Sequence, residues 1–218
     1  MSTLKFSITM SLDGFVAGPN QSRENPLGEG GMRLHEWAFA TRTFREMQGR
    51  EGGSAGLDDD EAGRWNETVG AVIMGRNMFG PVRGEWPAEP WNGWWGDDPP
   101  YHCPVFVLTH HAREPVEMHG GTTFHFVTDG IEAALERATE ASNGLDVAIG
   151  GGASTAQQYL RVGLVDEMRI HAVPVLLGRG ERLFDGLDDA LDGFECVDLV
   201  SSPAAAHFSY VRRPQTHG

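Results

Sequence analysis

The sequence predicts an α/β protein built on a mainly parallel sheet. Three observations support this class: short apolar runs typical of strands buried on both faces, helical segments between them, and 40% hydrophobic with 22% charged residues. The repeated strand–helix–strand order builds parallel strands through right-handed crossovers. Because no linker separates two folded halves, we interpret the 218 residues as a single domain, 1–218.

The first quarter of the chain contains one clear strand and one helical segment. Residues 4–10 alternate apolar and polar side chains with period two, and the pattern stops at Asp13-Gly14, which is typical of a turn. A loop rich in glycine, proline and asparagine follows over residues 17–31. Apolar side chains then recur at helical spacing from Leu34 to Met47, which predicts one helix.

A glycine-rich segment, residues 49–56, separates this helix from the next element. The acidic triplet 58–60 complements the positive end of a helix, so we expect a short helix through Ala62, Trp65 and Val69. The continuous apolar run 71–74 then predicts a strand buried on both faces.

The middle of the chain is dominated by a long aromatic loop. Residues 80–104 contain six prolines, at 81, 87, 90, 99, 100 and 104, and four tryptophans, so no regular element persists there. This loop either stacks on a planar ligand or covers an exposed part of the core. Strands are predicted at 105–108 and 124–127, and a capping box from Thr128 to Glu132 predicts a helix from Ile131.

The last third of the chain completes the alternating pattern. The predicted elements are a strand at 147–149, a helix through Ala156 and Leu160 that ends at Gly163, a strand at 168–171, and two closing strands at 194–200 and 207–211. Because the closing strands follow each other without a helix between them, we expect them to be antiparallel.

Composition excludes several functions. A net charge of −14 and a pI near 4.9 disfavour nucleic acid and membrane surfaces as partners. No apolar run approaches the 18 residues of a membrane span. Cys103 and Cys196 match no metal or redox spacing and no leader precedes them, which predicts free thiols in a cytoplasmic protein. The nine histidines show no metal-ligand spacing, so no metal site is expected.

The segment from Ala148 to Ser154 carries the strongest chemical signal. A buried strand ends in Gly150, Gly151 and Gly152 where a helix begins, and such a joint either binds a phosphate or allows close packing. Thr155 occupies the third glycine of a dinucleotide fingerprint and Ala156 the last glycine of a hydrolase nucleophile elbow. A Rossmann domain and a serine hydrolase are therefore disfavoured.

Taken together, the motifs resemble the dihydrofolate reductase superfamily, and most closely the riboflavin-biosynthesis reductase (RibD C-terminal) domain family. The resemblance spans the whole chain in order and rests on Ser11-Leu12-Asp13-Gly14, residues 74–79, 107–110, 149–152 with 157–160, and 173–178 with Gly180 and 182–184. It implies a mixed, mainly parallel eight-stranded sheet flanked by helices, with NADPH lying across the strand ends.

The resemblance also assigns cofactor residues. The glycine turn and the following helix would receive the diphosphate, while Arg76 would pair with a 2′-phosphate unless it is only a strand-end arginine. Thr109 either contacts the adenosine half or merely ends a strand. The complete expected set is Val16, Ala17, Gly75, Arg76, Asn77, Leu108, Thr109, His110, Gly150, Gly151, Gly152, Ala153, Ser154 and Thr155.

Two residues are candidates for the chemistry itself. Asp13 either has a direct role in substrate binding or proton transfer, or it only forms the Asp-Gly turn. His171 shares a strand face with Arg169 and Val173; it either orients substrate and relays a proton, or is a sheet-edge or interface histidine. Phe15 replaces the lysine common in riboflavin-biosynthesis reductases, so a phosphorylated ribityl substrate is doubtful. Glu36 and Asp58 are weak candidates for the acidic residue that dihydrofolate reductases keep on their first helix.

We therefore expect an NADPH-dependent reductase that transfers a hydride to a C=N or C=O bond of a small planar heterocycle, such as a pterin-like compound. Two alternatives remain open at this point: a nucleotide-binding protein on the same fold without turnover, and a reductase that uses flavin or deazaflavin. The resemblance predicts a homodimer, for which the apolar run 173–177 and the long aromatic loop 80–104 offer a self-complementary surface.

Overall fold

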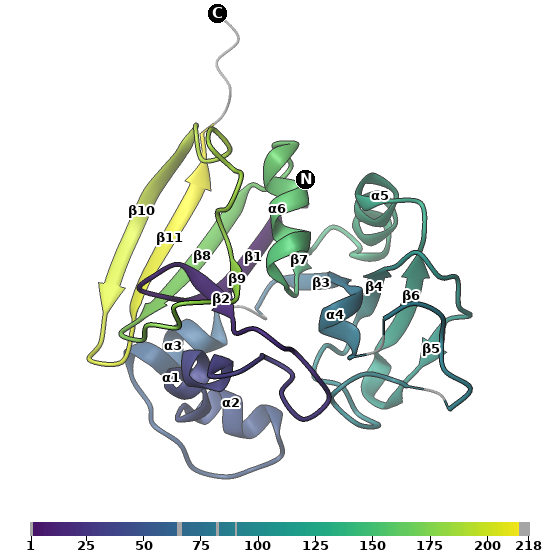
Figure 1. Cartoon of the computed structure of the whole chain (residues 1–218), viewed down its shortest axis with the longest axis horizontal. Helices are drawn as coiled ribbons and strands as arrows, with labels where there is room; N and C mark the ends of the chain where they lie inside the picture. The colour runs from purple at the N-terminus through teal and green to yellow at the C-terminus, as the bar shows by residue number, and fades with distance from the viewer. Residues whose placement is uncertain (1, 65–66, 82, 90, 214–218) are drawn as a thin grey trace, which may run out of the picture.

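A computed structural model describes residues 2–64, 67–81, 83–89 and 91–213. Its main feature is a nine-stranded sheet in the order β10-β11-β8-β1-β7-β3-β4-β6-β5, seen edge to edge in Figure 1. The strands are β1 (Leu4–Ser11), β3 (Val69–Gly75), β4 (Pro104–Leu108), β5 (Val116–Glu117), β6 (Thr123–Val127), β7 (Asp146–Ile149), β8 (Glu167–Val173), β10 (Phe194–Ser201) and β11 (Ala206–Arg212). A second small sheet pairs β2 (Phe15–Ala17) with β9 (Glu181–Arg182).

The mixed α/β sheet predicted from the sequence is confirmed. Its six central strands, from β8 to β6, are parallel. The closing strands β10 and β11 are antiparallel to each other, and β11 is antiparallel to β8, as expected. The described sheet has nine strands instead of eight because the two-residue β5 adds an antiparallel edge to β6, and so short a strand has no period to detect.

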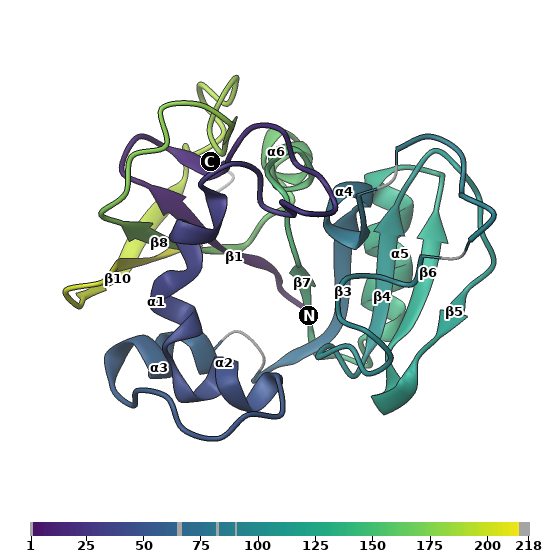
Figure 2. The ribbon, with the colours of Figure 1, turned by 60° about the horizontal axis from the view of Figure 1, so that its bottom comes forward.

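Helices lie against both faces of this sheet. They are η1 (Gly31–His35), α1 (Glu36–Phe39), α2 (Arg42–Met47), α3 (Leu57–Gly63), α4 (Arg76–Phe79), η2 (His119–Gly121), α5 (Ile131–Ala141) and α6 (Ala153–Arg161). Figure 2 shows α1, α2 and α3 grouped beside β1 and β8, whereas α4 and α5 lie with β3, β4 and β6. Among the described residues, no helix is long and apolar enough to cross a membrane.

The main core lies between the sheet and the two longest helices. Phe6, Ile73 and Ile149 of the strands pack with Ala134 of α5 and Tyr159 of α6. A second cluster on the opposite face of β3 and β4 includes Phe79 and Phe124, and the aromatic loop covers it with Trp86, Trp91 and Tyr101. That part of the loop covers the core, which is one of the two roles expected for it.

The first predicted helix is wrong in one respect, because it is broken into η1, α1 and α2. Thr41 has an extended backbone and caps α2, since its side chain accepts from the Phe44 amide at 3.2 Å and donates to the Ala38 carbonyl at 2.6 Å. The helical spacing of apolar residues does not reveal this side-chain cap, which competes with a continuous helix.

Two other helix boundaries also differ from the predictions. Val69 opens β3 instead of continuing α3. The expected capping box at Thr128 does not form, because Gly130 occupies the N-cap position of α5 and no side chain caps that end. Trp65, assigned to the short helix, and Pro90 of the aromatic loop lie outside the described residues.

Candidate active site

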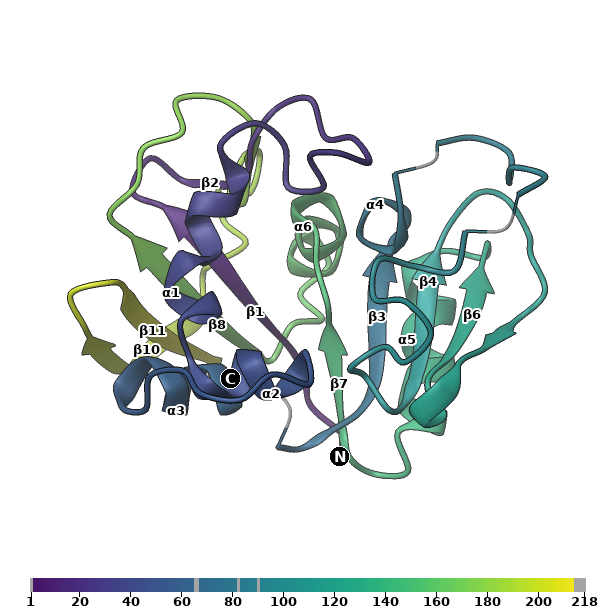
Figure 3. The same cartoon turned by 90° about the horizontal axis from the view of Figure 1, so that it is seen from below.

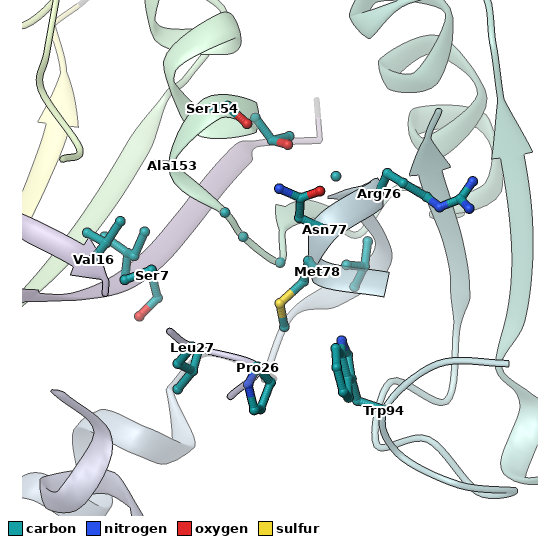
Figure 4. Close-up of a pocket in the computed structure, with 18 of the residues that line it drawn as sticks. Ser7, Val16, Pro26, Leu27, Arg76, Asn77, Met78, Trp94, Ala153 and Ser154 are labelled. Carbon is teal, nitrogen blue, oxygen red and sulfur yellow. The ribbon is translucent and has the colours of Figure 1, made fainter. Parts of the chain in front are cut away.

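A cleft of about 940 Å³ opens at the carboxyl ends of the central parallel strands. Ligands of open α/β sheets bind at this edge, because the loops and helix starts that follow the strands converge there. Figure 3 shows α6 and α4 side by side above β7 and β3, at the middle of this edge. Figure 4 shows Ser7 and Val16 on one side of the pocket and Asn77 and Met78 on the other.

The glycine turn joins β7 to α6 at the centre of the cleft. Gly150 would bring a Cβ to 3.1 Å from Val72, and Gly151 has a φ of +117°, which side chains rarely adopt. The α6 N-terminus follows with no side-chain cap, so backbone amides and the positive helix end face the cleft. Both observations fit the approach of an anionic group to the bare backbone.

Gly75 is the second place where the backbone comes unusually close. A Cβ at this position would lie 2.5 Å from the Thr155 hydroxyl, which brings the end of β3 against the first turn of α6. The Gly75 amide also donates to the Gly151 carbonyl at 3.2 Å. The ends of β3 and β7 therefore together form the floor of the cleft.

Arg76 lies at the start of α4 and lines the same cleft. Its guanidinium donates to the Thr109 hydroxyl at 3.2 Å and lies 3.1 Å above the ring of Trp86. Within the described chain, its buried Nη2 has no hydrogen-bond partner, and burial together with Arg113 and Arg83 lowers the Arg76 pKa to about 10. A buried donor without a partner fits an incoming acceptor such as a phosphate oxygen.

The charge around Arg76 is locally positive in an acidic chain. Arg83 lines the cleft, and Arg113 donates to the Trp91 carbonyl at 2.6 Å and to Asn92 at 2.8 Å. The described carboxylates form no ion pair with these three arginines within 4.0 Å, although Glu85 lies 3.2 Å from His111 nearby. Three arginines without acidic partners favour an anionic ligand at this end.

All fourteen residues expected at the cofactor line this one cleft. Val16 and Ala17 reach it from β2, and Leu108, Thr109 and His110 reach it from the end of β4. Segments more than 130 residues apart in the sequence therefore meet at one surface, as Figure 4 shows for Val16 and Ser154.

His171 also faces the cleft, but it is almost fully buried. Its Nε2 lies 2.7 Å from the Ser7 hydroxyl, and its Nδ1 lies 2.6 Å from Nδ1 of His207. Burial, with help from His207, Arg169 and His35, lowers the pKa of His171 to about 3. His171 is therefore neutral at physiological pH and accepts or donates according to its tautomer.

Asp13 lies outside the cleft lining and stabilises a turn. Its carboxylate accepts from the Ser11 hydroxyl at 2.6 Å and from the amides of Leu177 and Gly178 at 3.1 and 2.7 Å. The Ser11 bond is the largest cause that lowers the pKa of Asp13 to about 2. These partners tie the β1–β2 turn to the segment after β8, which matches the turn interpretation of Asp13.

Sequence reasoning missed several residues that line the cleft. Ser7 and Thr9 lie on one face of β1 because side chains alternate along a strand, and this alternation was the available signal. His35, Trp37 and Glu61 reach the cleft from η1, α1 and α3, and burial lowers the pKa of His35 to about 4. Trp94 and Trp95 line it as well, so the aromatic loop serves the cleft in addition to the core.

The family model of the RibD C-terminal domain matches residues 2–201. The chain belongs to this family. No curated protein matches the sequence. Solved structures share the fold over nearly the whole chain, so the dihydrofolate-reductase-like architecture is confirmed.

Three of these structures illustrate the similarity. A riboflavin biosynthesis protein from Shewanella sp. PV-4 is 22% identical with a TM-score of 0.63, covering 98% of this chain and 100% of its own. RibD from Acinetobacter baumannii is 15% identical with a TM-score of 0.58, and the match covers 98% of this chain but 59% of that one. Dihydrofolate reductase from Enterococcus faecalis, complexed with NADP(H), is 14% identical with a TM-score of 0.51 and 97% of both chains covered.

Proposed function

We propose that this protein is an NADPH-dependent reductase that transfers a hydride to a C=N or C=O bond of a small planar heterocycle. The observation that carries the proposal is the convergence on one cleft of the glycine turn, the start of α6 and an Arg76 donor that has no partner among the described residues. The Enterococcus faecalis dihydrofolate reductase of the same fold is complexed with NADP(H), which supports the same class of cofactor here.

Three groups of the described residues would each hold a different part of the cofactor. Amides at Gly151 to Ser154 would hold the diphosphate, and Arg76 with Thr109 would hold the adenosine end and its 2′-phosphate. Val16 and Ala17 would lie against the nicotinamide, which supplies the hydride when bound. The chain itself contributes orientation and an apolar environment that excludes water.

The remaining part of the cleft favours an uncharged planar substrate. Its walls carry apolar side chains, including Ile8, Leu27, Trp37 and Phe44, with only a few polar groups between them. Among the described lining residues, the only lysines and arginines are Arg76 and Arg83, both at the proposed cofactor end. Phe15 is buried beneath Arg182, and neither of these two residues lines the cleft.

The proposal is tested by a turnover screen. NADPH oxidation is followed by absorbance with pterins and other planar C=N and C=O heterocycles as acceptors. We expect at least one acceptor to be reduced with NADPH in preference to NADH. Saturable NADPH binding without oxidation of any acceptor would instead favour a non-catalytic nucleotide-binding protein.

A flavin- or deazaflavin-dependent reductase is the other alternative, and the arginine cluster argues for a phosphorylated nucleotide without deciding which one. A visible absorption spectrum of the purified protein separates the cases, because flavins absorb there and NADPH does not. We expect no visible band, and we expect that added flavin does not support turnover.

We also propose that the protein is a homodimer that uses the exposed face of β10, β11, β8 and β1. This face carries a second groove of about 390 Å³, lined by Met10, Leu12, Ile170, Phe194, Phe208 and Tyr210. Leu12 and Leu199 are 67% and 56% exposed, and Leu199 pairs with Phe208 of the groove. Exposed apolar side chains beside an apolar groove favour this face as an interaction surface.

A further inference from the structure

A chain of four polar side chains runs from the cleft into the protein. The Ser7 hydroxyl lies 2.7 Å from Nε2 of His171, whose Nδ1 lies 2.6 Å from Nδ1 of His207. Nε2 of His207 lies 3.0 Å from Asp58, and Ser202 donates to the other Asp58 oxygen at 3.0 Å. Each residue comes from a different element, namely β1, β8, β11 and α3.

The surroundings hold this chain in one geometry. Thr9, His171 and His207 are cross-strand neighbours, and His171 and His207 are both almost fully buried. The Trp37 ring lies 4.7 Å from His171 and 5.0 Å from His207, and its Nε1 donates to Thr9 at 3.1 Å. Two buried imidazoles with both ring nitrogens hydrogen-bonded are unusual in a protein core, because apolar side chains fill the same space without needing polar partners.

The hydrogen bonds allow only one consistent direction when both histidines are neutral. Asp58 only accepts, so His207 carries its proton on Nε2 and accepts at Nδ1. His171 then donates from Nδ1 and accepts from the Ser7 hydroxyl at Nε2. The chain therefore polarises the Ser7 hydroxyl, which lies at the cleft in Figure 4.

We propose that Ser7 is the proton donor of the reduction and that His171, His207 and Asp58 form the relay that supplies it. This inference rests on the proposed reductase function. Addition of a hydride to a C=N or C=O bond leaves negative charge on nitrogen or oxygen, and that atom needs one proton. Ser7 and His171 lie beside the apolar half of the cleft, where the heterocycle is proposed to bind.

The proton balance of the relay is explicit. In the loaded state, His207 holds protons on both ring nitrogens beside the Asp58 carboxylate. The Ser7 proton passes to the substrate, the Nε2 proton of His171 passes to Ser7, and the Nδ1 proton of His207 passes to His171. The product gains one proton and His207 becomes neutral. After release, water in the open cleft returns a proton through Ser7 by the reverse shift.

Neighbouring charges determine where the stored proton lies. His35 of η1 and Arg169 of β8 help to lower the pKa of His171 and so oppose a positive charge on it, whereas the Asp58 carboxylate of α3 lies 3.0 Å from Nε2 of His207. The side chains supplied by β1 and α1 are Ser7, Thr9 and Trp37, which are uncharged near neutral pH. A proton held by the histidine pair is therefore placed on His207.

The first test is nitrogen-15 NMR of the histidine rings in the whole chain. We expect His171 protonated on Nδ1 and His207 on Nε2 near neutral pH, with one further proton added to His207 on acidification. Asp58→Asn removes the carboxylate beside His207 and should move the midpoint of that further protonation to lower pH. His125→Gln, a histidine on β6 away from the relay, should leave it unchanged. Protonation of His171 on Nε2 while both rings are neutral, or an unmoved midpoint in Asp58→Asn, would overturn the relay.

The second test uses NADPH and the acceptor identified in the turnover screen. Ser7→Ala should lower kcat by roughly 10²–10⁴-fold, while NADPH affinity stays within about twofold and Ser7→Thr, which keeps the hydroxyl, recovers activity. Asp58→Asn should displace the pH profile of kcat together with the NMR midpoint, and His207→Gln should remove that pH dependence, which a structural role would not do. The exposed Ser201→Ala is the matched control.

The outcomes separate this inference from the proposed function. Full kcat and an unchanged pH profile in Ser7→Ala would refute the relay and leave the reductase intact. Absence of NADPH binding in the wild type would refute the reductase, and the NMR titration would still decide whether the four residues share protons as described.

Discussion

At the residue scale, Asp13 and Arg76 both come from short sequence motifs but differ in role: Asp13 stabilises a turn, whereas Arg76 is placed to bind a ligand. Asp13 has all its strong partners within the chain, so its carboxylate joins two loops. Arg76 keeps one buried donor without a partner in the described chain and faces the cleft. Whether the polar atoms of the side chain already have partners therefore distinguishes these two residues.

Replacing Asp13 should affect stability in a pH-dependent way. Because the folded-state pKa of Asp13 is lowered to about 2, its carboxylate stabilises the fold above the unfolded pKa near 4, and this contribution disappears as the pH falls toward 2. Asp13→Asn should therefore unfold at lower urea concentration than the wild type at pH 7. The two should converge near pH 2. Asp188→Asn, an exposed aspartate, serves as control, and a difference that persists at pH 2 would refute this role.

At the element scale, the contact between β3 and α6 sets the floor of the cleft. It depends on the absence of a side chain at Gly75, whose backbone φ of −77° is otherwise acceptable for alanine. The effect of a substitution there is therefore steric, and the atom that must move is the Thr155 hydroxyl at the start of α6.

Gly75→Ala should destabilise the fold by about 1–3 kcal/mol, the usual cost of overpacking. The double variant Gly75→Ala with Thr155→Ala should recover most of this loss, because the next atom, the Thr155 Cβ, would lie at an ordinary 3.8 Å. Urea unfolding of the wild type, both single variants and the double variant measures the coupling. Additive effects would show that the close contact at Gly75 is not the cause.

The elements also show what the sequence predicts and what it does not. Buried strands such as β3 and β7 were predictable because their own apolar runs define them. The break at Thr41 was not, since a side-chain cap competes with the helical period there. The contact between His207 and Asp58 joins residues 149 positions apart. No local sequence pattern predicts it, because it forms only when the folded chain brings α3 to β11.

At the scale of the whole molecule, the two faces of β8 serve different surfaces. His171 faces the cleft, whereas Met168, Ile170 and Ala172 line the second groove on the opposite face. The strand alternation predicted from residues 168–173 therefore separates a proposed catalytic surface from a proposed subunit interface.

The homodimer is tested by light scattering after size exclusion. We expect a mass of about twice the 23.8 kDa of one chain for the wild type. Leu199→Glu places a charge on the exposed apolar face and should yield the monomer, whereas Val162→Glu at the exposed end of α6 should not. A wild type that elutes at the mass of one chain would refute the proposal.

The measurement that tests the central claim most directly is calorimetric titration of NADPH and NADH into the wild type, Arg76→Ala and Arg213→Ala. Arg213 pairs with Glu195 at the β10 edge of the sheet, far from the cleft, and serves as the matched control. We predict that the wild type prefers NADPH and that Arg76→Ala loses about 1.5–3 kcal/mol for NADPH, the range for a hydrogen bond to a charged group. The loss for NADH should be smaller, and Arg213→Ala should bind like the wild type. Absence of saturable binding by both nucleotides, or NADPH affinity unaffected by Arg76→Ala, would contradict the account.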